Sequence, residues 1–427
     1  MIYVVQPGDT LYSISQAFGV SIESIENNNG LAPGEERLVE GQALLILIPE
    51  QVYTVQAGDT LYSISADTGI PVKEILRKNV VLSRQDYLVV GQELVLVYEG
   101  EENKIRQAPV AVSGYAYPFI DRQVFVETLP FLERLFVFSY GFTESGELIV
   151  PEDAYLRSKA EEYGVDTILV LTSMNREGRF SNQLVNLLME DMTVQDAVLE
   201  NIRQQVLEKN FAGVDLDFEY ILASDKQAYV DFANRMAQML HPLGKTLSIA
   251  LPPKVSADQP GLLYEGIDYG GLGAAADEVL LMTYEWGYKY GPPMAVAPIP
   301  QVEKVLQYAV SEIPPEKINL GIPNYAYDWP LPYVRGETAA QTIGNQQAVE
   351  IAMARSMAIQ YDENAKSPYF RYFDENGITH EVWFEDVRSI EEKARLVEKY
   401  GFAGMEYWNL MRPFTANWLL LEKIFNV

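Results

Sequence analysis

The chain has 427 residues and a formal net charge of −28, with 48% hydrophobic and 22% charged residues. This length suits two or three domains, and the composition is that of a globular protein. Nucleic acids and anionic membrane surfaces require clustered lysine and arginine, so we expect neither as a partner. The acidity is compatible with a neutral ligand such as an uncharged sugar, and it equally serves solubility alone.

Cysteine is absent, and the only histidines are His241 and His380. Disulfide bonds, thiolate nucleophiles and cysteine metal sites are therefore excluded, and serine–histidine catalysis and multi-histidine zinc sites are disfavoured. We expect both histidines to be structural or surface residues. We expect neither a metal ion nor a cofactor.

The N-terminus, Met1–Val5, lacks the basic region and the apolar core of a signal peptide. No segment has the length and hydropathy of a membrane span. Either a signal has been removed, or the protein reaches its substrate without standard secretion. The initiating Met1 favours the second explanation.

The first hundred residues repeat themselves with a period of 50 residues. The segment 8–15, GDTLYSIS, recurs unchanged at 58–65, and Gly41 has its counterpart in Gly91. We predict two units, residues 1–49 and 50–98, each with the order strand, helix, helix, strand.

In the first unit the strands are expected at Tyr3–Gln6 and Gln42–Ile48. Asp9 is expected to cap the first helix, because its side chain precedes the apolar periodicity. Ser21 is expected to cap the second helix, which should end at Gly30.

These units resemble LysM modules, which bind N-acetylglucosamine chains in peptidoglycan and chitin, and the Gly-Asp-Thr-Leu turn is the most specific part of the resemblance. In that family the ligand groove lies between this turn and the loop after the second helix. The alternative is that the paired modules serve assembly or contacts with proteins. The resemblance implies glycan contacts at Asp9, Thr10, Leu11, Gly30 and Leu31 in the first unit, and at Asp59, Thr60, Leu61, Val80 and Val81 in the second.

Residues 99–104, EGEENK, are polar and lack apolar periodicity, so we interpret 99–108 as a linker. After it, apolar strand-like runs alternate with helical patterns such as 194–209, 226–240 and 389–400. Eight such runs imply an α/β fold with a closed parallel (β/α)₈ barrel over residues 109–427. The predicted strands are Val110–Tyr117, Leu135–Phe142, Thr167–Met174, Gly213–Glu219, Leu247–Leu251, Val279–Tyr284, Ile318–Pro323 and Gly404–Trp408.

The connection between the seventh strand and the last helix is roughly 55 residues long, which exceeds an ordinary loop. It contains a helical stretch near Ala348–Met357. A hairpin is expected to follow, with strands Pro368–Phe373 and Thr379–Phe384 joined by a turn at 374–377. We predict a small α+β insertion at about 330–385 on the C-terminal face of the barrel, where the active sites of such barrels lie.

The segment 211–219, FAGVDLDFE, carries three carboxylates at alternate positions. Side chains alternate along a strand, so Asp215, Asp217 and Glu219 share one face, and the apolar face packs against helices. The carboxylates therefore point into the barrel, where crowding raises at least one pKa, as a general acid requires. The alternatives are a metal site, which the lack of nearby histidines disfavours, and a buried polar network.

This strand resembles the catalytic strand of family 18 glycoside hydrolases, whose pattern is Asp-x-x-Asp-x-Asp-x-Glu, and the resemblance extends over the whole barrel. MTYEW at 282–286, GIPNY at 321–325 and GMEYW at 404–408 resemble the motifs of its sixth, seventh and eighth strands. Ala212 and Glu285 depart from the pattern, because aspartate is usual at both positions. The paired modules, the lack of a signal peptide and the sequence TYEWG resemble the spore cortex-lytic branch of this family.

The resemblance implies a retaining mechanism in which the acetamido oxygen of the substrate, rather than a carboxylate, attacks the anomeric carbon. Glu219 would protonate the leaving oxygen and then deprotonate water. Asp217 would orient the acetamido group and stabilise the positive intermediate, and Asp215 would tune Asp217. Tyr284 would donate a hydrogen bond to the acetamido oxygen, and Trp408 would stack under the sugar. Substrate contacts are implied for Met282, Tyr115, Glu285 and Tyr325, with packing an equal alternative for Tyr115.

The first hypothesis is an N-acetylglucosaminidase that cleaves β-1,4 bonds in peptidoglycan, in particular spore cortex fragments, and that the modules anchor to the spore or cell wall. The second is a chitinase or chito-oligosaccharide hydrolase with the same mechanism. The third is a non-catalytic glycan-binding protein on an inactive barrel. Glu219 favours an enzyme, because inactive relatives usually lose the proton donor. In each case the expected partner is peptidoglycan or a chitin-like N-acetylglucosamine polymer.

Overall fold

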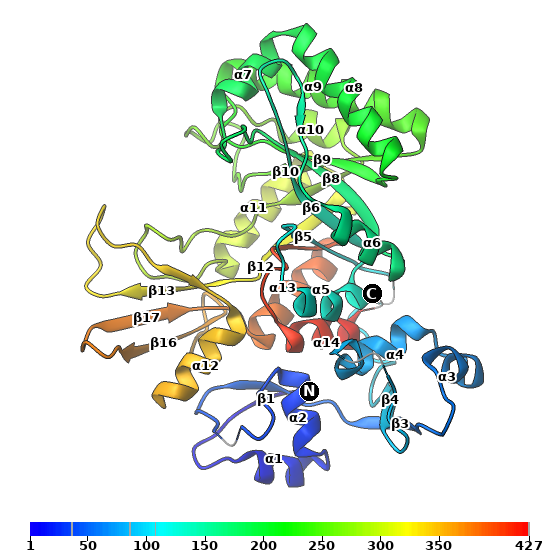
Figure 1. The fold of residues 1–427 in the computed structure, drawn as a ribbon. Coiled ribbons are helices and arrows are strands. Elements are labelled where there is room, and N and C mark those ends of the chain that lie inside the picture. Colours follow the sequence, from blue (N-terminus) through cyan, green and yellow to red (C-terminus); the bar gives the residue numbers. More distant parts are fainter. Residues whose placement is uncertain (36, 85–86, 107, 426–427) are drawn as a thin grey trace.

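The computed structural model describes residues 1–35, 37–84, 87–106 and 108–425. Two small N-terminal modules lie below a larger α/β barrel, and a separate antiparallel sheet extends from one side of the barrel (Figure 1). The predicted α/β architecture of modules, barrel and insertion is confirmed. Among the described residues, no helix is both long enough and apolar enough to cross a membrane.

Both repeats have the predicted order of strand, helix, helix, strand, although the strands of the first repeat are shorter than expected. In each repeat the two strands pair antiparallel. The first repeat consists of β1 (Ile2–Val4), α1 (Leu11–Phe18), α2 (Ile22–Asn29) and β2 (Ala43–Leu45). The second consists of β3 (Pro49–Thr54), α3 (Leu61–Thr68), α4 (Val72–Lys78), the 3₁₀ helix η1 (Val80–Arg84) and β4 (Glu93–Tyr98).

Threonine, and not the predicted aspartate, caps the first helix of each repeat. The Thr10 side chain accepts a hydrogen bond from the amide of Ser13 at 3.0 Å. Asp9 instead accepts hydrogen bonds from the Tyr3 hydroxyl at 2.6 Å and from the Gln6 amide at 2.8 Å. The same bonds recur in the second repeat. The prediction that Asp9 is the N-cap was wrong by one residue. The Asp9 carboxylate points toward the preceding turn, which it stabilises, and not toward the helix.

The second helix of the first repeat begins and ends as predicted. Ser21 accepts a hydrogen bond from the Ser24 amide, and Gly30 ends the helix in a left-handed conformation with φ of 62°. In the second repeat Val80 replaces this glycine, and a branched side chain disfavours positive φ. There α4 ends without a left-handed residue, and the chain continues into η1.

Eight parallel strands close into the predicted barrel, because β5 pairs with β6 as well as with β18. The strands are β5 (Ala111–Ala116), β6 (Arg134–Phe142), β8 (Asp166–Thr172), β9 (Gly213–Asp217), β10 (Thr246–Leu251), β11 (Glu278–Leu281), β12 (Ile318–Pro323) and β18 (Gly404–Trp408), with β7 (Leu148–Ile149) paired to the end of β6. Several predicted strands were too long, and for the site it matters that β9 ends before Glu219 and β11 ends before Tyr284. Both residues lie in loops at the C-terminal mouth, beyond the hydrogen bonds that join neighbouring strands.

Helices cover the outside of the barrel. They are α5 (Arg122–Thr128), α6 (Ala154–Glu162), α7 (Asn182–Glu190), α8 (Met192–Glu208), α9 (Lys226–Leu240), α10 (Tyr269–Ala275), α11 (Ile299–Glu312), α13 (Val387–Tyr400) and α14 (Thr415–Ile424), with the 3₁₀ turns η2 (Leu129–Phe131), η3 (Ala223–Asp225), η4 (His241–Leu243) and η5 (Pro315–Lys317). Val214, Leu216 and Phe218 join the core beneath these helices. The carboxylates of the same strand therefore face the interior, as the alternation predicted.

The insertion is a five-stranded antiparallel sheet with one helix. Its strands are β13 (Ala326–Pro330), β14 (Gln341–Ile343), β15 (Gln360–Asp362), β16 (Ser367–Phe373) and β17 (Thr379–Trp383), in the order β14-β13-β17-β16-β15, and α12 (Asn345–Arg355) lies between β14 and β15. The hairpin of β16 and β17 was expected, whereas β13 was not.

The first repeat packs against this insertion. Val5 and Leu11 of the repeat share one buried cluster with Phe370 of the insertion. The Gln346 side chain on α12 donates a hydrogen bond to the Gly30 carbonyl at 2.6 Å. The Ile359 amide donates to the Glu40 carbonyl at 2.8 Å, and Arg388 donates to the Gly41 carbonyl at 3.1 Å.

The second repeat has a small hydrophobic core of its own, and it meets the barrel through Val80 and Tyr98, which join the barrel core, and through basic side chains. Lys73 donates a hydrogen bond to the Leu132 carbonyl at 2.9 Å, and Arg77 donates to the Pro130 carbonyl at 2.7 Å. The segment after it, interpreted as a linker, lies against the barrel, where the Ile105 amide donates to the Ile424 carbonyl at 2.8 Å. The repeats are thus docked on the barrel rather than loosely tethered to it.

Candidate active site

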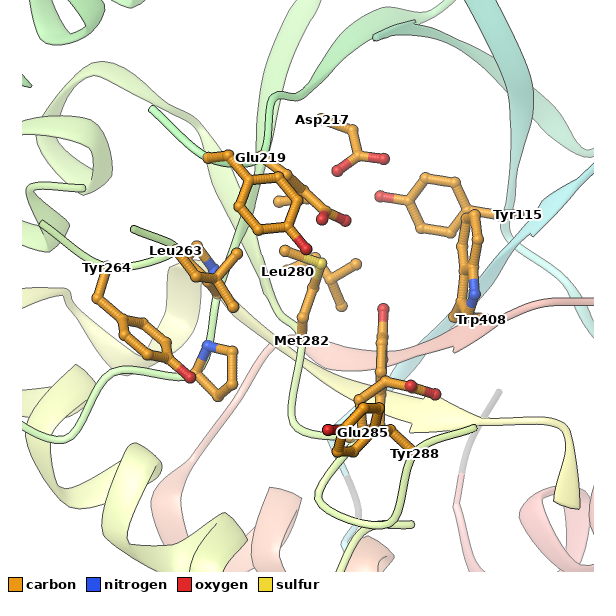
Figure 2. Close-up of a pocket in the computed structure, with 15 residues that line it drawn as sticks. Tyr115, Asp217, Glu219, Leu263, Tyr264, Leu280, Met282, Glu285, Tyr288 and Trp408 are labelled. Carbon is orange, nitrogen blue, oxygen red and sulfur yellow. The ribbon is translucent and has the colours of Figure 1, made fainter. Parts of the chain in front are cut away.

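A cavity of about 430 Å³ opens at the C-terminal mouth of the barrel (Figure 2). It brings together residues from the strands β5, β9, β10, β11 and β18 and from the loops that follow β9, β10 and β11. The predicted site residues that line it are Tyr115, Asp217, Glu219, Met282, Tyr284, Glu285 and Trp408. Asp215 and Tyr325 do not line it.

Asp215 lies beneath the cavity and is fully buried. Its Oδ2 accepts a hydrogen bond from the Tyr115 hydroxyl at 3.0 Å, and its Oδ1 accepts one from the Ser248 hydroxyl at 2.7 Å. Ser248 is its register partner on the adjacent strand β10. Both oxygens of Asp215 are therefore held by the protein, and Asp215 does not line the cavity.

Asp217 lies one inward position closer to the mouth, between Asp215 and the cavity. It is only 8% exposed, and its Oδ1 has no hydrogen-bond partner among the residues that the structure describes. A buried acceptor at the wall of a cavity is suited to a donor on a bound molecule.

The three carboxyl groups all hold protons more tightly than free side chains do. Burial raises the pKa of Asp215 to about 6, against the lowering effect of the bonds from Ser248 and Tyr115. Burial, followed by the charges of Glu219 and Asp215, raises the pKa of Asp217 well above its ordinary value. Burial and the charge of Glu285 raise the pKa of Glu219. A carboxyl group in this state is suited to donate a proton near neutral pH.

Aromatic rings form one wall of the cavity. Trp408 is packed edge-on against Tyr115 and Phe138, with ring centroids 5.4 Å and 4.8 Å apart. Figure 2 shows Trp408 beside Tyr115, whose hydroxyl is directed toward the carboxylates. Tyr284 is almost fully buried and lines the same cavity. Tyr115 therefore both packs and participates in the polar site.

Glu285 is held in an unusual backbone conformation with φ of 71°. Its Oε1 accepts hydrogen bonds from the hydroxyls of Tyr325 at 2.5 Å and of Tyr327 at 2.9 Å. Tyr325 was expected to contact substrate directly, but its side chain instead fixes Glu285, which does reach the cavity. Strained backbone at a cavity wall persists only where the surroundings hold it, as these two tyrosines do.

Several residues of the site were missed from the sequence. The alternation of the predicted strand 247–251 could have indicated Ser248 and Ala250, because it places both on the inner face. Alternation in the predicted strand 279–284 could likewise have indicated Leu280, which shares a face with Met282 and Tyr284. The other lining residues lie in loops, for which no periodic signal exists: Tyr220, Pro252, Pro253, Leu263, Tyr264 and Tyr288.

The model of Glycosyl hydrolases family 18 matches residues 130–412, and that of the LysM domain matches residues 3–46 and 53–97. The chain belongs to glycosyl hydrolase family 18. The resemblances predicted from the sequence, to this family and to LysM, are confirmed.

Two relatives of this family 18 chain carry the name cortical fragment-lytic enzyme. The one from Bacillus anthracis is 41% identical over 435 residues, covering 100% of this chain and 98% of its own. The one from Bacillus subtilis (strain 168) is 41% identical over 301 residues, or 70% of each chain. The crystal structure of the Bacillus cereus spore cortex-lytic enzyme SleL is similar with a TM-score of 0.83 and 37% identity, covering 100% of this chain and 98% of that chain.

The two LysM domains present their predicted glycan residues differently. In the second domain Asp59, Thr60 and Leu61, with Tyr62 and Tyr87, line a groove of about 800 Å³ whose other side is the end of α6 in the barrel, at residues 162–164. Val80 and Val81 do not line it but face a cleft of about 440 Å³ between the domains.

In the first LysM domain Gly30 and Leu31 line a cavity of only about 120 Å³, closed by Gln346 and its neighbours on α12. Leu11 is buried in the domain core, and Asp9 and Thr10 hold the turn and cap the helix. The loop that was expected to bind glycan in this domain therefore faces the insertion.

Proposed function

We propose that this family 18 chain is a retaining N-acetylglucosaminidase that hydrolyses β-1,4 bonds in peptidoglycan, with spore cortex fragments as substrate. The observation that carries the proposal is the convergence of Glu219, Asp217 and Tyr284 on one cavity above Asp215. The cortical fragment-lytic enzyme from Bacillus anthracis, 41% identical over 100% of this chain, supports peptidoglycan over chitin as the substrate.

In the proposed reaction the acetamido oxygen of the bound sugar attacks the anomeric carbon, and the glycosidic bond breaks. Glu219 gives its proton to the leaving oxygen and then takes one from the water that opens the ring-closed intermediate. Asp217 accepts a hydrogen bond from the acetamido N–H through its unpartnered Oδ1 and balances the positive charge. Tyr284 donates to the acetamido oxygen, and Trp408 supports the apolar sugar face.

We infer that the LysM domains keep the enzyme on spore or wall peptidoglycan. The open groove of the second domain supports this, because its exposed tyrosines suit the apolar faces of sugars. The net charge of −28 means that an anionic wall repels the chain, so contact must rest on the sugars themselves.

The test is side-by-side digestion of purified cortex peptidoglycan fragments and of chitin oligosaccharides, with mass spectrometry and NMR of the products. We expect faster cleavage of the cortex fragments, N-acetylglucosamine at the new reducing ends and retained anomeric configuration. A stable thiazoline analogue of the intermediate should inhibit competitively. Faster chitin cleavage would assign the chain to the chitinases, and inverted products or no inhibition would overturn the acetamido mechanism.

A further inference from the structure

The groove of the second LysM domain is formed by two domains and not by one. Leu61 and Tyr62, at the start of α3, line one side, and the end of α6 in the barrel, at residues 162–164, lines the other. The groove measures about 800 Å³ and is larger than the catalytic cavity, which measures about 430 Å³. A wall from the barrel could not be predicted from the repeat, because the segment that supplies it lies far along the chain.

Direct bonds between the LysM domain and the barrel hold the two walls in place. Lys73 lines the groove, and its Nζ donates a hydrogen bond to the Leu132 carbonyl of the barrel at 2.9 Å. One turn further along α4, Arg77 donates to the Pro130 carbonyl at 2.7 Å and pairs with Glu422 on α14 at 3.4 Å. The groove is therefore preformed, and a ligand can contact both domains without moving them together.

The charged side chains of the groove already have partners within the protein. Among the described residues that line it, these side chains are Asp59, Lys73 and Glu162. Asp59 accepts a hydrogen bond from the Tyr53 hydroxyl at 2.8 Å, and Glu162 pairs with Lys159 at 2.6 Å. Lys73 is bonded to the barrel. The groove is therefore better suited to a neutral ligand than to an ionic one.

Tyrosine rings supply much of the remaining surface. Tyr62 is 80% exposed and Tyr87 is 68% exposed, while Tyr163 is half-buried against the barrel core. Such rings suit the apolar faces of sugars, and their hydroxyl groups can bond to polar substituents. The LysM model matches residues 53–97, which supports a sugar over an apolar peptide as the occupant.

The groove and the catalytic cavity lie at opposite ends of the barrel. Gly164 precedes β8, and Pro130 and Leu132 precede β6, so these residues mark the N-terminal ends of the strands. Glu219 and Trp408 lie at the C-terminal ends of theirs. In Figure 1 the second domain lies near α6, whereas the insertion, which follows the C-terminal end of β12, extends from the other side. The strand β8 has 7 residues, so the two ends are about 20 Å apart.

We propose that the second LysM domain and the α6 end of the barrel form one composite site for an uncharged stretch of N-acetylglucosamine glycan, and that this stretch is not the one being cleaved. The inference rests on the proposed function, in which the LysM domains bind wall glycan. The barrel then takes part in two glycan sites, one that cleaves at its C-terminal mouth and one that holds at its N-terminal end. Binding at the second site leaves the mouth free for another strand, or for a distant part of the same strand.

The first experiment compares Tyr163→Ala with Tyr155→Ala in a pelleting assay with insoluble peptidoglycan. Both tyrosines are half-buried against the barrel core, on α6 or directly after it, but Tyr155 lies outside the groove lining. We expect Tyr163→Ala to weaken binding about fivefold, the effect of one ring, and Tyr163→Phe to retain most of it. Tyr155→Ala should bind like the wild type. Wild-type binding by Tyr163→Ala, or equal losses in both alanine variants, would overturn the composite site.

A second measurement leaves every side chain of the groove intact. The full-length Glu219→Gln variant, which should not cleave, is mixed with a tetramer of N-acetylglucosamine, and amide hydrogen exchange is followed with and without a saturating thiazoline analogue. We expect the tetramer to slow exchange at 58–62 and at 162–166, and we expect the analogue to leave this protection in place. Protection at 58–62 alone would overturn the role of the barrel. Loss of the protection when the analogue binds would overturn the separation of the two sites.

These measurements distinguish failure of the inference from failure of the proposed function. If the wild type failed to cleave cortex fragments, the proposed activity would fall, whereas the exchange data would still decide whether the groove binds glycan with both walls. If the chain pelleted with peptidoglycan but the tetramer protected neither wall, the composite site would fall and wall binding would stand. The exchange experiment also decides the matter if Tyr163→Ala does not fold, because it needs no substitution in the groove.

Discussion

The barrel mouth and the groove of the second LysM domain both present tyrosines and carboxylates, but they bury them to different degrees. Asp215 is fully buried and Asp217 is 8% exposed, whereas Tyr62 in the LysM groove is 80% exposed. Burial raises the pKa of a carboxyl group and makes proton transfer near neutral pH possible. The LysM groove instead presents exposed tyrosine rings, which suit contact with the apolar faces of a sugar polymer.

A second contrast separates the two LysM domains, which share the segment GDTLYSIS. The first domain shares a hydrophobic cluster with the insertion, while the second has a core of its own and joins the barrel core through Val80 and Tyr98. Identical turns therefore produced the same domain fold but not the same exposed surface. Whether the groove of a LysM domain stays open depends on which part of the barrel or insertion packs beside it.

The largest expected effect comes from Glu219→Gln, which removes the acid without changing shape. We expect kcat on cortex fragments to fall at least ~10²-fold, the scale of general acid catalysis, while binding to insoluble peptidoglycan stays intact. Initial rates and a pelleting assay measure the two properties separately. Near-normal turnover would show that Glu219 is not the general acid. Loss of pelleting would show that the barrel site also binds insoluble peptidoglycan.

Removal of residues 1–98 should act on both binding and stability. Linking a LysM glycan site to the barrel site raises avidity by ~10²-fold or more, so pelleting with peptidoglycan should fall by that order at low and at high salt. Because Phe370 and its cluster become exposed, the truncated barrel should also melt several degrees lower. Intact pelleting would refute anchoring, and an unchanged Tm would refute the shared core.

A matched glycine pair tests the docking of the first domain. Gly41 and Gly91 are equivalent and both have positive φ, of 81° and 88°. A Cβ at Gly41 would lie 1.8 Å from the Ile359 carbonyl oxygen, whereas a Cβ at Gly91 meets nothing within 4 Å. We expect Gly91→Ala to cost about 1–2 kcal/mol from backbone strain, and Gly41→Ala to cost about 1–3 kcal/mol more. Chemical denaturation measures both, and equal losses would contradict the docked arrangement.

A matched tyrosine pair tests which LysM domain binds glycan. Tyr62 lines the open groove, and Tyr12 is its equivalent in the first domain. We expect Tyr62→Ala to weaken pelleting severalfold, because one sugar-stacking ring contributes roughly 1 kcal/mol. Tyr12→Ala should have less effect. If Tyr12→Ala were the more harmful substitution, the first domain would be the main anchor.

The smallest expected effect concerns pH. Glu219 must be protonated to act, and the charge of Glu285 is one cause of its raised pKa. Glu285→Gln removes that charge and lowers the pKa of Glu219, so the basic limb of kcat/KM should move to lower pH. The variant Glu147→Gln, at an exposed residue that does not line the cavity, is the control and should leave the limb in place. If the basic limb of kcat/KM also stayed at the same pH in Glu285→Gln, the charge of Glu285 would have no effect on the pKa of Glu219.

The agreement between sequence and structure was best where a repeated pattern has one physical meaning. Alternation at 213–218 predicted which side chains face the barrel interior, and Ser21 and Gly30 marked the limits of a helix. Agreement failed where two local choices were similar in energy. Aspartate and threonine are both favourable N-cap residues, so only the backbone conformation of the turn decides that Thr10, and not Asp9, caps the helix.

The roles of Tyr325 and Ser248 could not be predicted, because both depend on residues far away in the chain. Tyr325 reaches Glu285 from 40 positions along the sequence, and Ser248 reaches Asp215 from 33. No periodicity encodes such pairs, which exist only after the barrel has closed.

The sequence by itself determined the repeat, the barrel and the order of the catalytic carboxylates, because each follows from local periodicity and short motifs. Only the tertiary structure decided which LysM groove stays open and which hydroxyl groups hold Asp215 and Glu285. It also decided that the segment 99–106 lies against the barrel. These outcomes depend on contacts between distant segments, and their energies come from burial and hydrogen bonds that no single segment contains.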